Sequence, residues 1–193
     1  FTLGDKPESR YRAAREALHA LGCETTVDYL LRMAARVVEQ TGLLPHINAG
    51  ILSADQMAAL KEVSVSQGIM LESASTRLAA PGGPHHGSPD KDPAIRLENI
   101  ELAGRLKVPF TTGILVGIGE TRQERIESSL AFRELHDRYS HIQEVIIQPF
   151  RPKPGTLMAD QIGADDDELK WSIAVARIIF GPEMSIQAPP NLS

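Results

Sequence analysis

Hydrophobic positions follow two alternating spacings along the chain, and the alternation predicts helices separated by strands. Apolar side chains at helical spacing indicate amphipathic helices, whereas short continuous apolar runs indicate buried strands. The helices are expected at 9–21, 26–41, from 53 onward, and at 92–106, 122–138 and 165–180. The strands are expected at 1–4, 43–49, 69–73, 109–117, 144–150 and 184–188.

Local signals mark where several of these helices begin and end. Residues 53–56 (Ser-Ala-Asp-Gln) and 121–124 (Thr-Arg-Gln-Glu) are capping boxes, in which the first and fourth side chains each bind a backbone N–H of the other residue. Pro93 suits a first helical turn, and Gly42 suits the position after a helix end. The side chains expected to face the core are Met57, Leu60 and Val63, then Ile95, Leu102 and Leu106, then Ile126, Leu130 and Leu135.

Apolar strands between amphipathic helices predict an α/β fold with a parallel sheet covered by helices. Six strands are fewer than the eight of a closed (β/α)₈ barrel. An incomplete barrel and an open doubly wound sheet both fit this pattern. In either architecture the functional site lies at the carboxyl ends of the strands.

Composition narrows the function classes. The chain is 42% hydrophobic and 23% charged, which is ordinary for a globular protein, and its 193 residues suit one domain, 1–193. The net charge of −5 disfavours a nucleic-acid partner, which needs a basic surface. The longest run without a charged residue, 41–54, is too short for a membrane span.

Cys23 is the sole cysteine. A single cysteine excludes an internal disulfide and a cysteine-only zinc or iron–sulfur site formed by this chain alone. It also suits the reducing cytoplasm, where we expect the protein to reside. Cys23 follows a glycine between two predicted helices, so no reactivity is expected of it.

Polar side chains and glycines gather at five predicted strand ends. A strand end is solvated and needs polar residues for that reason alone, but five such ends meet at one mouth of a parallel sheet. In chain order these residues are Gly4, Asp5 and Lys6, then His46 and Asn48, then Glu72, Ser75 and Arg77, then Thr111 and Thr112, and finally Gln148.

The fourth strand ends in a glycine-rich segment, residues 113–120. Gly113, Gly117 and Gly119 match neither the dinucleotide-binding nor the P-loop spacing. They expose backbone suited to a flat ligand such as a nucleobase, or else they allow tight packing of helix on sheet. Glu120 is either a catalytic base or a cap of the next helix.

Other polar clusters favour structural interpretations. The loop 79–92 holds His85 and His86, and a solvated lid is a better interpretation of it than a metal site. Three consecutive acids at 165–167 indicate a helix start, where negative charge is favoured. Trp171 and Phe180 are expected to pack rather than to stack on a ligand.

Seven segments resemble one enzyme family, the 7,8-didemethyl-8-hydroxy-5-deazariboflavin synthases. The resemblance is to the radical S-adenosylmethionine (SAM) half that closes the deazaflavin ring, and it extends over nearly the whole chain. The glycine-rich segment alone would indicate only a radical SAM enzyme. The segments are 1–8, 41–48, 70–75, 88–91, 109–121, 141–148 and 186–192.

The resemblance implies a partial (β/α)₆ TIM-like barrel of the radical SAM type. It implies a [4Fe–4S] cluster, held by a CxxxCxxC loop, that cleaves SAM to a 5′-deoxyadenosyl radical. This radical abstracts hydrogen from an adduct of a hydroxybenzyl group and a ribityl-aminouracil. Cyclisation with loss of ammonia, a lyase reaction, then gives the chromophore of coenzyme factor 420.

The same resemblance assigns roles to individual residues. Asp5 and Lys6, beside Gly4, match the segment that meets the ammonium and carboxylate of SAM, and Glu72 matches a ribose contact. Residues 113–120, with Gly113, Gly117, Gly119 and Glu120, match the adenine side. The strand-end residues expected to line the substrate pocket are His46, Asn48, Ser75, Arg77, Thr111, Thr112 and Gln148.

This sequence departs from the family pattern twice. The CxxxCxxC motif is absent, so we expect the first strand and the cluster loop upstream of Phe1 and an inactive chain without them. Pro149 stands where the family has Asn, and proline has neither an amide side chain nor an N–H.

Two further functions remain open. The adduct-forming sibling enzyme and the radical SAM enzymes of the futalosine route to menaquinone share this fold. A barrel fragment that binds a ligand without catalysis is the alternative of a different class. For the synthase we expect a small-molecule substrate, the adduct-forming half as a fused or separate partner, and an electron donor.

Overall fold

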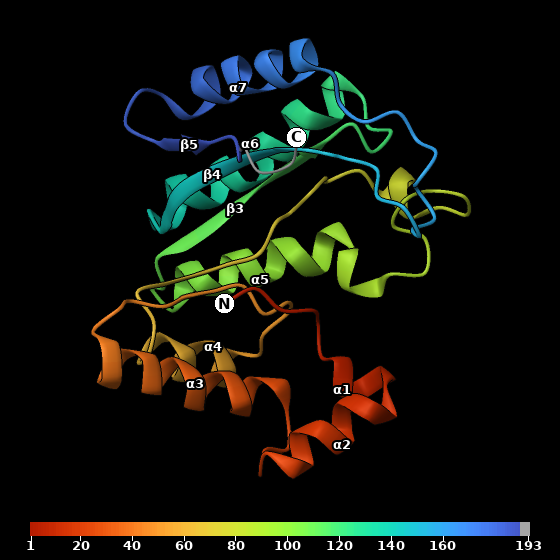
Figure 1. Cartoon of the computed structure of the whole chain (residues 1–193). Coiled ribbons are helices and arrows are strands. Elements are labelled where there is room, and N and C mark those ends of the chain that lie inside the picture. Colours follow the sequence, from red (N-terminus) through yellow and green to blue (C-terminus); the bar gives the residue numbers. More distant parts are fainter. Residues whose placement is uncertain (190–193) are drawn as a thin grey trace.

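The computed structural model describes residues 1–189, and the end of the 186–192 segment therefore lies outside the described residues. Figure 1 shows helices and strands alternating along the chain. The helices are α1 (Pro7–Arg10), α2 (Arg12–Ala20), α3 (Thr26–Thr41), α4 (Ala54–Lys61), α5 (Pro93–Arg105), α6 (Arg122–Tyr139) and α7 (Asp166–Phe180), with short 3-10 helices η1 (Thr76–Ala79) and η2 (Pro89–Lys91). The strands are β1 (His46–Ile47), β2 (Ser66–Gly68), β3 (Phe110–Val116), β4 (Ile142–Pro149) and β5 (Ser185–Gln187).

The five strands form one parallel sheet in the order β1-β2-β3-β4-β5. Each strand pairs with the next one along the chain, so the strand order has no reversal. A doubly wound sheet requires such a reversal, whereas a barrel adds strands in sequence. The strand order therefore favours the partial TIM-like barrel over the open doubly wound sheet.

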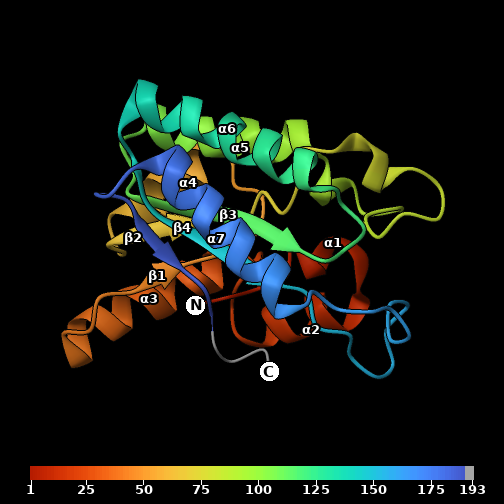
Figure 2. The same ribbon diagram turned by 90° about the horizontal axis from the view of Figure 1, so that it is seen from above.

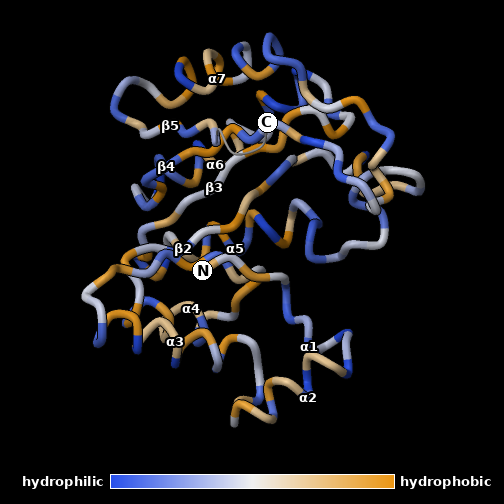
Figure 3. Tube along the Cα trace, viewed as in Figure 1, coloured by the Kyte–Doolittle hydropathy of each residue, from blue (hydrophilic) through white to orange (hydrophobic). Residues whose placement is uncertain are grey.

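The longer helices follow the sheet in the same order as the strands (Figures 1 and 2). Helix α5 lies beside α6, and α6 lies beside α7, while these three helices also pack on β3 or β4. Apolar and polar turns alternate along α7 in Figure 3, as expected of a helix with one buried face. Phe132 on α6 and Phe180 on α7 stack in the core, with ring centroids 5.2 Å apart.

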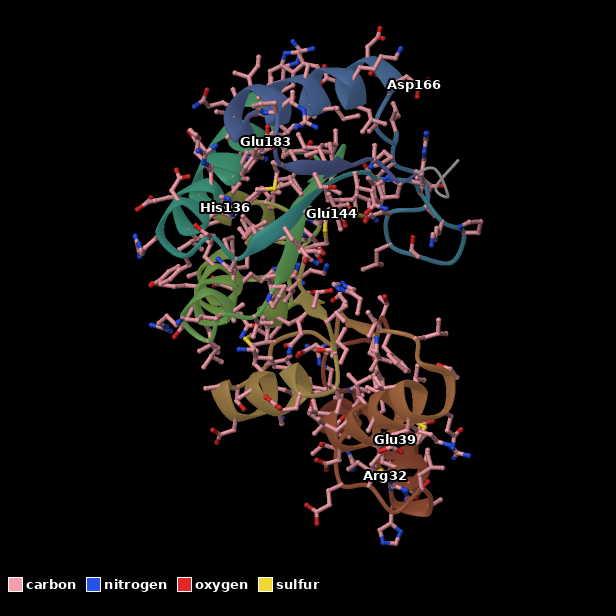
Figure 4. The ribbon with its side chains drawn as sticks, turned by 90° about the vertical axis from the view of Figure 1, so that its left-hand side faces the viewer. Arg32, Glu39, His136, Glu144, Asp166 and Glu183 are labelled. Atoms are coloured by element: carbon pink, nitrogen blue, oxygen red, sulfur yellow. The ribbon has the colours of Figure 1, made fainter. Side chains whose placement is uncertain are left out.

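Several predicted boundaries are confirmed. Helix α3 has the predicted range and ends at Gly42, whose φ of 70° is the left-handed value of a glycine cap. The capping boxes at 53–56 and 121–124 are both formed. Pro93 opens α5, and the acids at 165–167 open α7. Figure 4 shows Asp166 there, on the outside of the molecule.

Other predicted elements are wrong in position or length. The helix expected at 9–21 is broken at Tyr11, whose extended backbone separates α1 from α2. The strand expected at 69–73 lies earlier, at β2, and Glu72 forms only a single parallel bridge with Ile114. The strand expected at 1–4 is reduced to one bridge between Thr2 and Asn48.

Leu102, Leu106 and Leu135 pack in or against the core as predicted, but one residue on each of the same two helices does not. Ile95 is 40% exposed and Leu130 is 50% exposed, although both were expected in the core. The buried face of α5 instead carries Arg96 and Asn99 beside Ile100. Polar side chains on a buried face shift the apparent apolar stripe, because hydrophobic periodicity counts them as exposed. In residues 1–189 no helix is long and apolar enough to cross a membrane.

Candidate functional site

Three segments meet at the carboxyl ends of the strands, and two cavities lie among them. The segments are 76–92, 117–121 and 150–164, and they gather on the right of Figure 1. The strand-end cavity holds about 400 Å³ and is lined by Leu115, Gln148, Pro149, Phe150, Arg151, Lys153, Thr156, Leu157 and Met158. The loop cavity holds about 470 Å³ and is lined by Arg77, Leu78, Gly82, Gly83, Pro84, His86, Ile118, Gly119, Leu157, Met158 and Gln161.

The strand-end cavity lies at the end of β3 and β4. Leu115 and Gln148 are register partners on these two strands, so the cavity begins at the last paired residues of the sheet. Pro149 lines the cavity together with Gln148. The walls are largely hydrocarbon and the Gln148 amide is a polar group among them, a combination that suits a flat heteroaromatic ring.

The loop cavity is bounded by Arg77, which is fixed in position by its neighbours. Its Nε and Nη2 atoms lie 3.1 and 2.8 Å from the two carboxylate oxygens of Glu124, and Nη2 also donates to the Gly119 carbonyl at 2.8 Å. Ser75 donates to the same Glu124 carboxylate at 2.5 Å. The Arg77 guanidinium, with the hydrogen bonds from Ser75 and the backbone, lowers the pKa of Glu124 to about 2. Ser75 and Arg77 are therefore brought together, as partners of Glu124.

Glu72 lies at the centre of a charged cluster. Its Oε1 atom is 2.6 Å from Lys91 Nζ and 3.1 Å from Arg96 Nη1, and its Oε2 atom is 2.9 Å from His85 Nε2. The side chain is 13% exposed. Burial alone would raise its pKa, but His85, Lys91 and Arg96 outweigh burial and lower the pKa to about 2. We call these four residues the Glu72 cluster.

The Glu72 cluster corrects one expectation about the loop 79–92. His85 is only 5% exposed, because its ring is held against Glu72. That part of the loop is therefore a packed segment and not a solvated lid. His86, the next residue, is exposed and lines the loop cavity. No group of three potential metal ligands occurs within residues 1–189.

Glu120 holds the turn that follows β3. Its two carboxylate oxygens accept hydrogen bonds from the backbone N–H groups of Gly117 and Ile118, both at 2.8 Å. Its Oε1 atom also lies 2.6 Å from Arg125 Nε. The side chain is almost fully buried. Glu120 does not cap the next helix, as one of its two predicted roles required, because Thr121 is the N-cap of α6; its carboxylate instead closes the turn before that helix.

The three glycines of segment 113–120 have different roles. A Cβ at Gly113 would overlap the carbonyl oxygen of Ile146, so this glycine allows β3 and β4 to approach. Gly117 has a φ of 95°, and a side chain there would meet the backbone of Ala164. Gly119 has a φ of 102° and open space beside it, and it lines the loop cavity. Of the three, Gly119 is the one that faces a cavity.

His46 and Thr111 meet inside the sheet, together with Ser66. His46 Nδ1 lies 2.7 Å from Ser66 Oγ, and its Nε2 lies 3.4 Å from Thr111 Oγ1. A Cβ at Gly68 would overlap Thr111 Oγ1, so the glycine makes room for this contact. Burial lowers the pKa of His46, which keeps its ring neutral near pH 7. This cluster lies away from both cavities, because none of its residues lines either one.

The remaining predicted site residues also lie outside the two cavities. Thr112 is buried and accepts a hydrogen bond from the Leu71 N–H at 3.3 Å. Asn48 pairs with Thr2 in a parallel bridge. Asp5 accepts from the Ile51 N–H at 2.9 Å, and Lys6, next to it, is the N-cap of α1. Gly4 has open space beside it.

Sequence reasoning missed Glu124 and Arg96, which organise the two networks. Glu124 was identified only as the fourth residue of a capping box, yet it also binds Ser75 and Arg77. Arg96 was not predicted to belong to the site. A charged residue on the buried face of α5 is the feature of the sequence that could have revealed it. A buried arginine needs a partner, and Glu72 is that partner.

Comparison with known proteins gives sequence matches along the entire chain. The chain is 54% identical over 193 residues to a protein named FO synthase from Nocardia farcinica, and 55% identical to one from Streptomyces avermitilis; it spans 22% of each. It is 45% identical to a 7,8-didemethyl-8-hydroxy-5-deazariboflavin synthase from Methanopyrus kandleri and spans 58% of that protein. The chain thus spans less than two thirds of each of these relatives. No protein-family model matches it.

Solved structures share the fold at low sequence identity. The FeFe-hydrogenase maturase HydG from Carboxydothermus hydrogenoformans has a TM-score of 0.72 at 17% identity, over 86% of this chain and 40% of that one. Methylornithine synthase has a TM-score of 0.61 at 16% identity, over 86% of this chain and 54% of that one. The chain therefore shares the fold of these two proteins, and its strand order is that of a partial TIM-like barrel. Over its whole length, the chain is homologous to part of the 7,8-didemethyl-8-hydroxy-5-deazariboflavin (FO) synthases.

Proposed function

We propose that this chain is part of a radical SAM enzyme that forms the chromophore 7,8-didemethyl-8-hydroxy-5-deazariboflavin. The observation that carries the proposal is the identity of 45–55% along all 193 residues to proteins named for that product. The two cavities support it, because TIM-barrel enzymes have their sites at the carboxyl ends of the strands.

The strand-end cavity fits the adenine of SAM. Leu115 and Phe150 offer apolar contact, and the Gln148 amide can pair with a ring nitrogen and an amino group. With a reduced cluster held by residues outside this chain, SAM would supply a 5′-deoxyadenosyl radical. Asp5 and Lys6 are proposed to meet the ammonium and the carboxylate at the other end of SAM. Glu72 is proposed to accept a hydrogen bond from a ribose hydroxyl of SAM. Its carboxylate would then contact that hydroxyl in addition to His85, Lys91 and Arg96.

The residues of this chain do not fit a [4Fe–4S] cluster. Such a cluster in this family requires three cysteine thiolates, and Cys23 is the sole cysteine. Cys23 is also buried, with Sγ 3.0 Å from Arg32 Nη1. The cluster ligands of the proposed enzyme therefore belong to other residues.

The substrate is proposed to be the hydroxybenzyl–ribityl-aminouracil adduct. Loss of a hydrogen atom to the 5′-deoxyadenosyl radical, cyclisation, loss of ammonia, and loss of a proton and one further electron would convert it into the deazaflavin, with SAM as the oxidant overall. Among the residues expected to contact the substrate, Arg77 lines the loop cavity and Gln148 lines the strand-end cavity, while Glu124 holds Ser75 and Arg77 in place. His46, Thr111, Thr112 and Asn48 have a weaker claim, because they contact other protein groups away from both cavities. The adduct-forming enzyme, fused or separate, and an electron donor are the proposed partners.

One experiment tests the proposal directly. The protein expressed from its complete gene is purified anaerobically, its cluster is reconstituted, and it is given SAM, reductant and the adduct. We expect 5′-deoxyadenosine and the deazaflavin, measured by chromatography and by absorbance. SAM cleavage without deazaflavin would contradict the proposed substrate, and parallel reactions with the substrates of the adduct-forming and menaquinone-route enzymes would then identify a sibling activity.

The alternative, a barrel that binds a ligand without catalysis, predicts a different result. It would bind S-adenosylhomocysteine and yet cleave no SAM after reconstitution. Equilibrium dialysis with radiolabelled SAM, alongside the assay for 5′-deoxyadenosine, separates this outcome from an enzyme.

A further inference from the structure

The loop cavity and the strand-end cavity are neighbours that share two lining residues. Leu157 and Met158 line both cavities, and no other residue does so. The polar groups differ: Gln148 and Lys153 line the strand-end cavity, whereas Arg77 lines the loop cavity. The two cavities therefore suit different ligands.

The inner walls of the loop cavity are fixed before any ligand arrives. Glu120 holds the turn at Ile118, and Glu124 holds Arg77. The Glu72 cluster anchors His85, which immediately precedes the cavity residue His86. Pre-formed walls reduce the ordering cost that a bound ligand would otherwise impose. The cavity volume of about 470 Å³ is within the usual range for small-molecule sites.

The loop cavity offers free polar groups, and one of them, on Arg77, can only donate hydrogen bonds. Arg77 uses Nε and Nη2 within the protein and leaves Nη1 without a partner among residues 1–189. Within the same residues, the His86 ring and the Gln161 amide make no side-chain hydrogen bond, and both residues are exposed. No aspartate or glutamate lines the cavity. These groups favour a ligand rich in acceptor oxygens and disfavour a cation.

We propose that the loop cavity binds a neutral or anionic ring that carries carbonyl or hydroxyl oxygens, with His86 and Gln161 as its recognition residues. Ile118 and Leu157 supply apolar contact for the faces of the ring. The identity of the ligand rests on the proposed function, in which the ribityl-aminouracil part of the substrate has this chemistry. The adenine of SAM would then occupy the neighbouring strand-end cavity, which shares Leu157 and Met158 with the loop cavity.

Binding measurements on the protein expressed from its complete gene test the inference. Ribityl-aminouracil and S-adenosylhomocysteine are titrated separately by calorimetry into wild type, His86→Ala and Gln161→Ala. We expect each substitution to weaken ribityl-aminouracil binding about tenfold, the loss of one hydrogen bond to the ligand. S-adenosylhomocysteine binding should change by less than about twofold, because these residues line only the loop cavity.

Two matched controls exclude general effects of the substitutions. His19→Ala removes an exposed histidine on α2, and Gln123→Ala removes an exposed glutamine on α6. Both should bind the two probes as wild type does. Equal binding of ribityl-aminouracil by wild type, His86→Ala and Gln161→Ala would overturn the inference, and so would an absence of binding by wild type.

The same protein distinguishes failure of the inference from failure of the proposed function. If deazaflavin forms but neither substitution alters ribityl-aminouracil binding, the function stands and the loop-cavity assignment fails. If the substitutions weaken binding but no deazaflavin forms, the binding site stands and the proposed function fails.

Discussion

Glu72 and Lys91 form an ion pair, with Oε1 and Nζ 2.6 Å apart, across a loop of 18 residues. The pair ties the strand-end region to η2, and His85 and Arg96 complete the cluster around the same carboxylate. Glu72 has a φ of 64°, which is unfavourable for a residue with a side chain. Its backbone is held by bonds to Gly113 and Leu115 of β3. Side chain and backbone together fix this corner of the site.

The charge of Glu72 should stabilise the fold, and the effect should depend on pH. The folded-state pKa of about 2 lies below the ordinary value of 4.5, so the contribution is fully present above pH 4.5 and is lost as the pH falls towards 2. Glu72→Gln should therefore cost about 2 to 3 kcal/mol in the free energy of unfolding at pH 7. Urea titrations at pH 7 and pH 3.5 measure this difference.

The control is Glu16→Gln, which alters an exposed i,i+4 pair with Arg12 and should cost less than about 0.5 kcal/mol. A Glu72→Gln protein as stable as wild type at pH 7 would contradict the prediction. So would a deficit that stays the same at pH 3.5.

Removal of the Glu120 carboxylate should unfold the turn after β3. Glu120→Ala leaves two backbone N–H groups and the buried Arg125 guanidinium without this acceptor, at a cost of about 3 to 5 kcal/mol. Thermal unfolding followed by circular dichroism tests this, with Glu127→Ala as the exposed control on α6. Equal melting temperatures for the two variants would show that the carboxylate is not needed.

Acid should destabilise the protein through His141. Burial lowers the pKa of His141, although its Nε2 bonds the Ile100 carbonyl at 2.9 Å. Its neutral form is therefore favoured in the folded state, and stability is lost as the pH falls below about 6.5, where the unfolded chain binds the proton. His141→Gln keeps a donor but does not titrate, so its free energy of unfolding should fall less between pH 7.5 and 5.5.

His46 and His136 also have lowered pKa values, so the His141 variant should flatten the pH profile only in part. His19→Gln, on the exposed surface of α2, should leave the profile unchanged. The prediction is wrong if His141→Gln loses as much stability as wild type over this pH range.

Gly113→Ala should damage the centre of the sheet. The added methyl group would overlap the Ile146 carbonyl, and only a separation of β3 from β4 can relieve the overlap. We expect a loss of at least about 3 kcal/mol in the free energy of unfolding, of the size seen for overpacked cores. Gly4→Ala, where nothing lies within 4 Å, should be nearly neutral in the same urea titration. Matching midpoints for these two variants would contradict the prediction.

The sequence was most informative where local chemistry decides the structure. The capping boxes at 53–56 and 121–124, Gly42, and the range of α3 depend on neighbouring residues and were confirmed. The parallel sheet was also confirmed, because apolar strands joined by amphipathic helices favour it, whereas the strand order was left open between two architectures. The resemblance supplied the family, which local patterns do not contain.

The sequence was least informative where distant residues meet. His85 was expected in solvent because its loop is polar, yet Glu72, 13 positions earlier, draws it into the core. The register of β2 was missed because Ser66 and Gln67 are polar but buried, and Gln67 bonds the Met57 carbonyl. Buried polar residues depend on partners that hydrophobic periodicity does not reveal.

Leu157 and Met158 line both cavities, so ligands in the two cavities would contact the same two side chains. A side-chain conformation favoured by one ligand is then the conformation that the other ligand meets. Thermodynamic linkage then requires reciprocity: whatever factor the first ligand contributes to the affinity of the second, the second returns to the first. A substitution of Leu157 or Met158 should therefore alter the affinities of both cavities and the coupling between them.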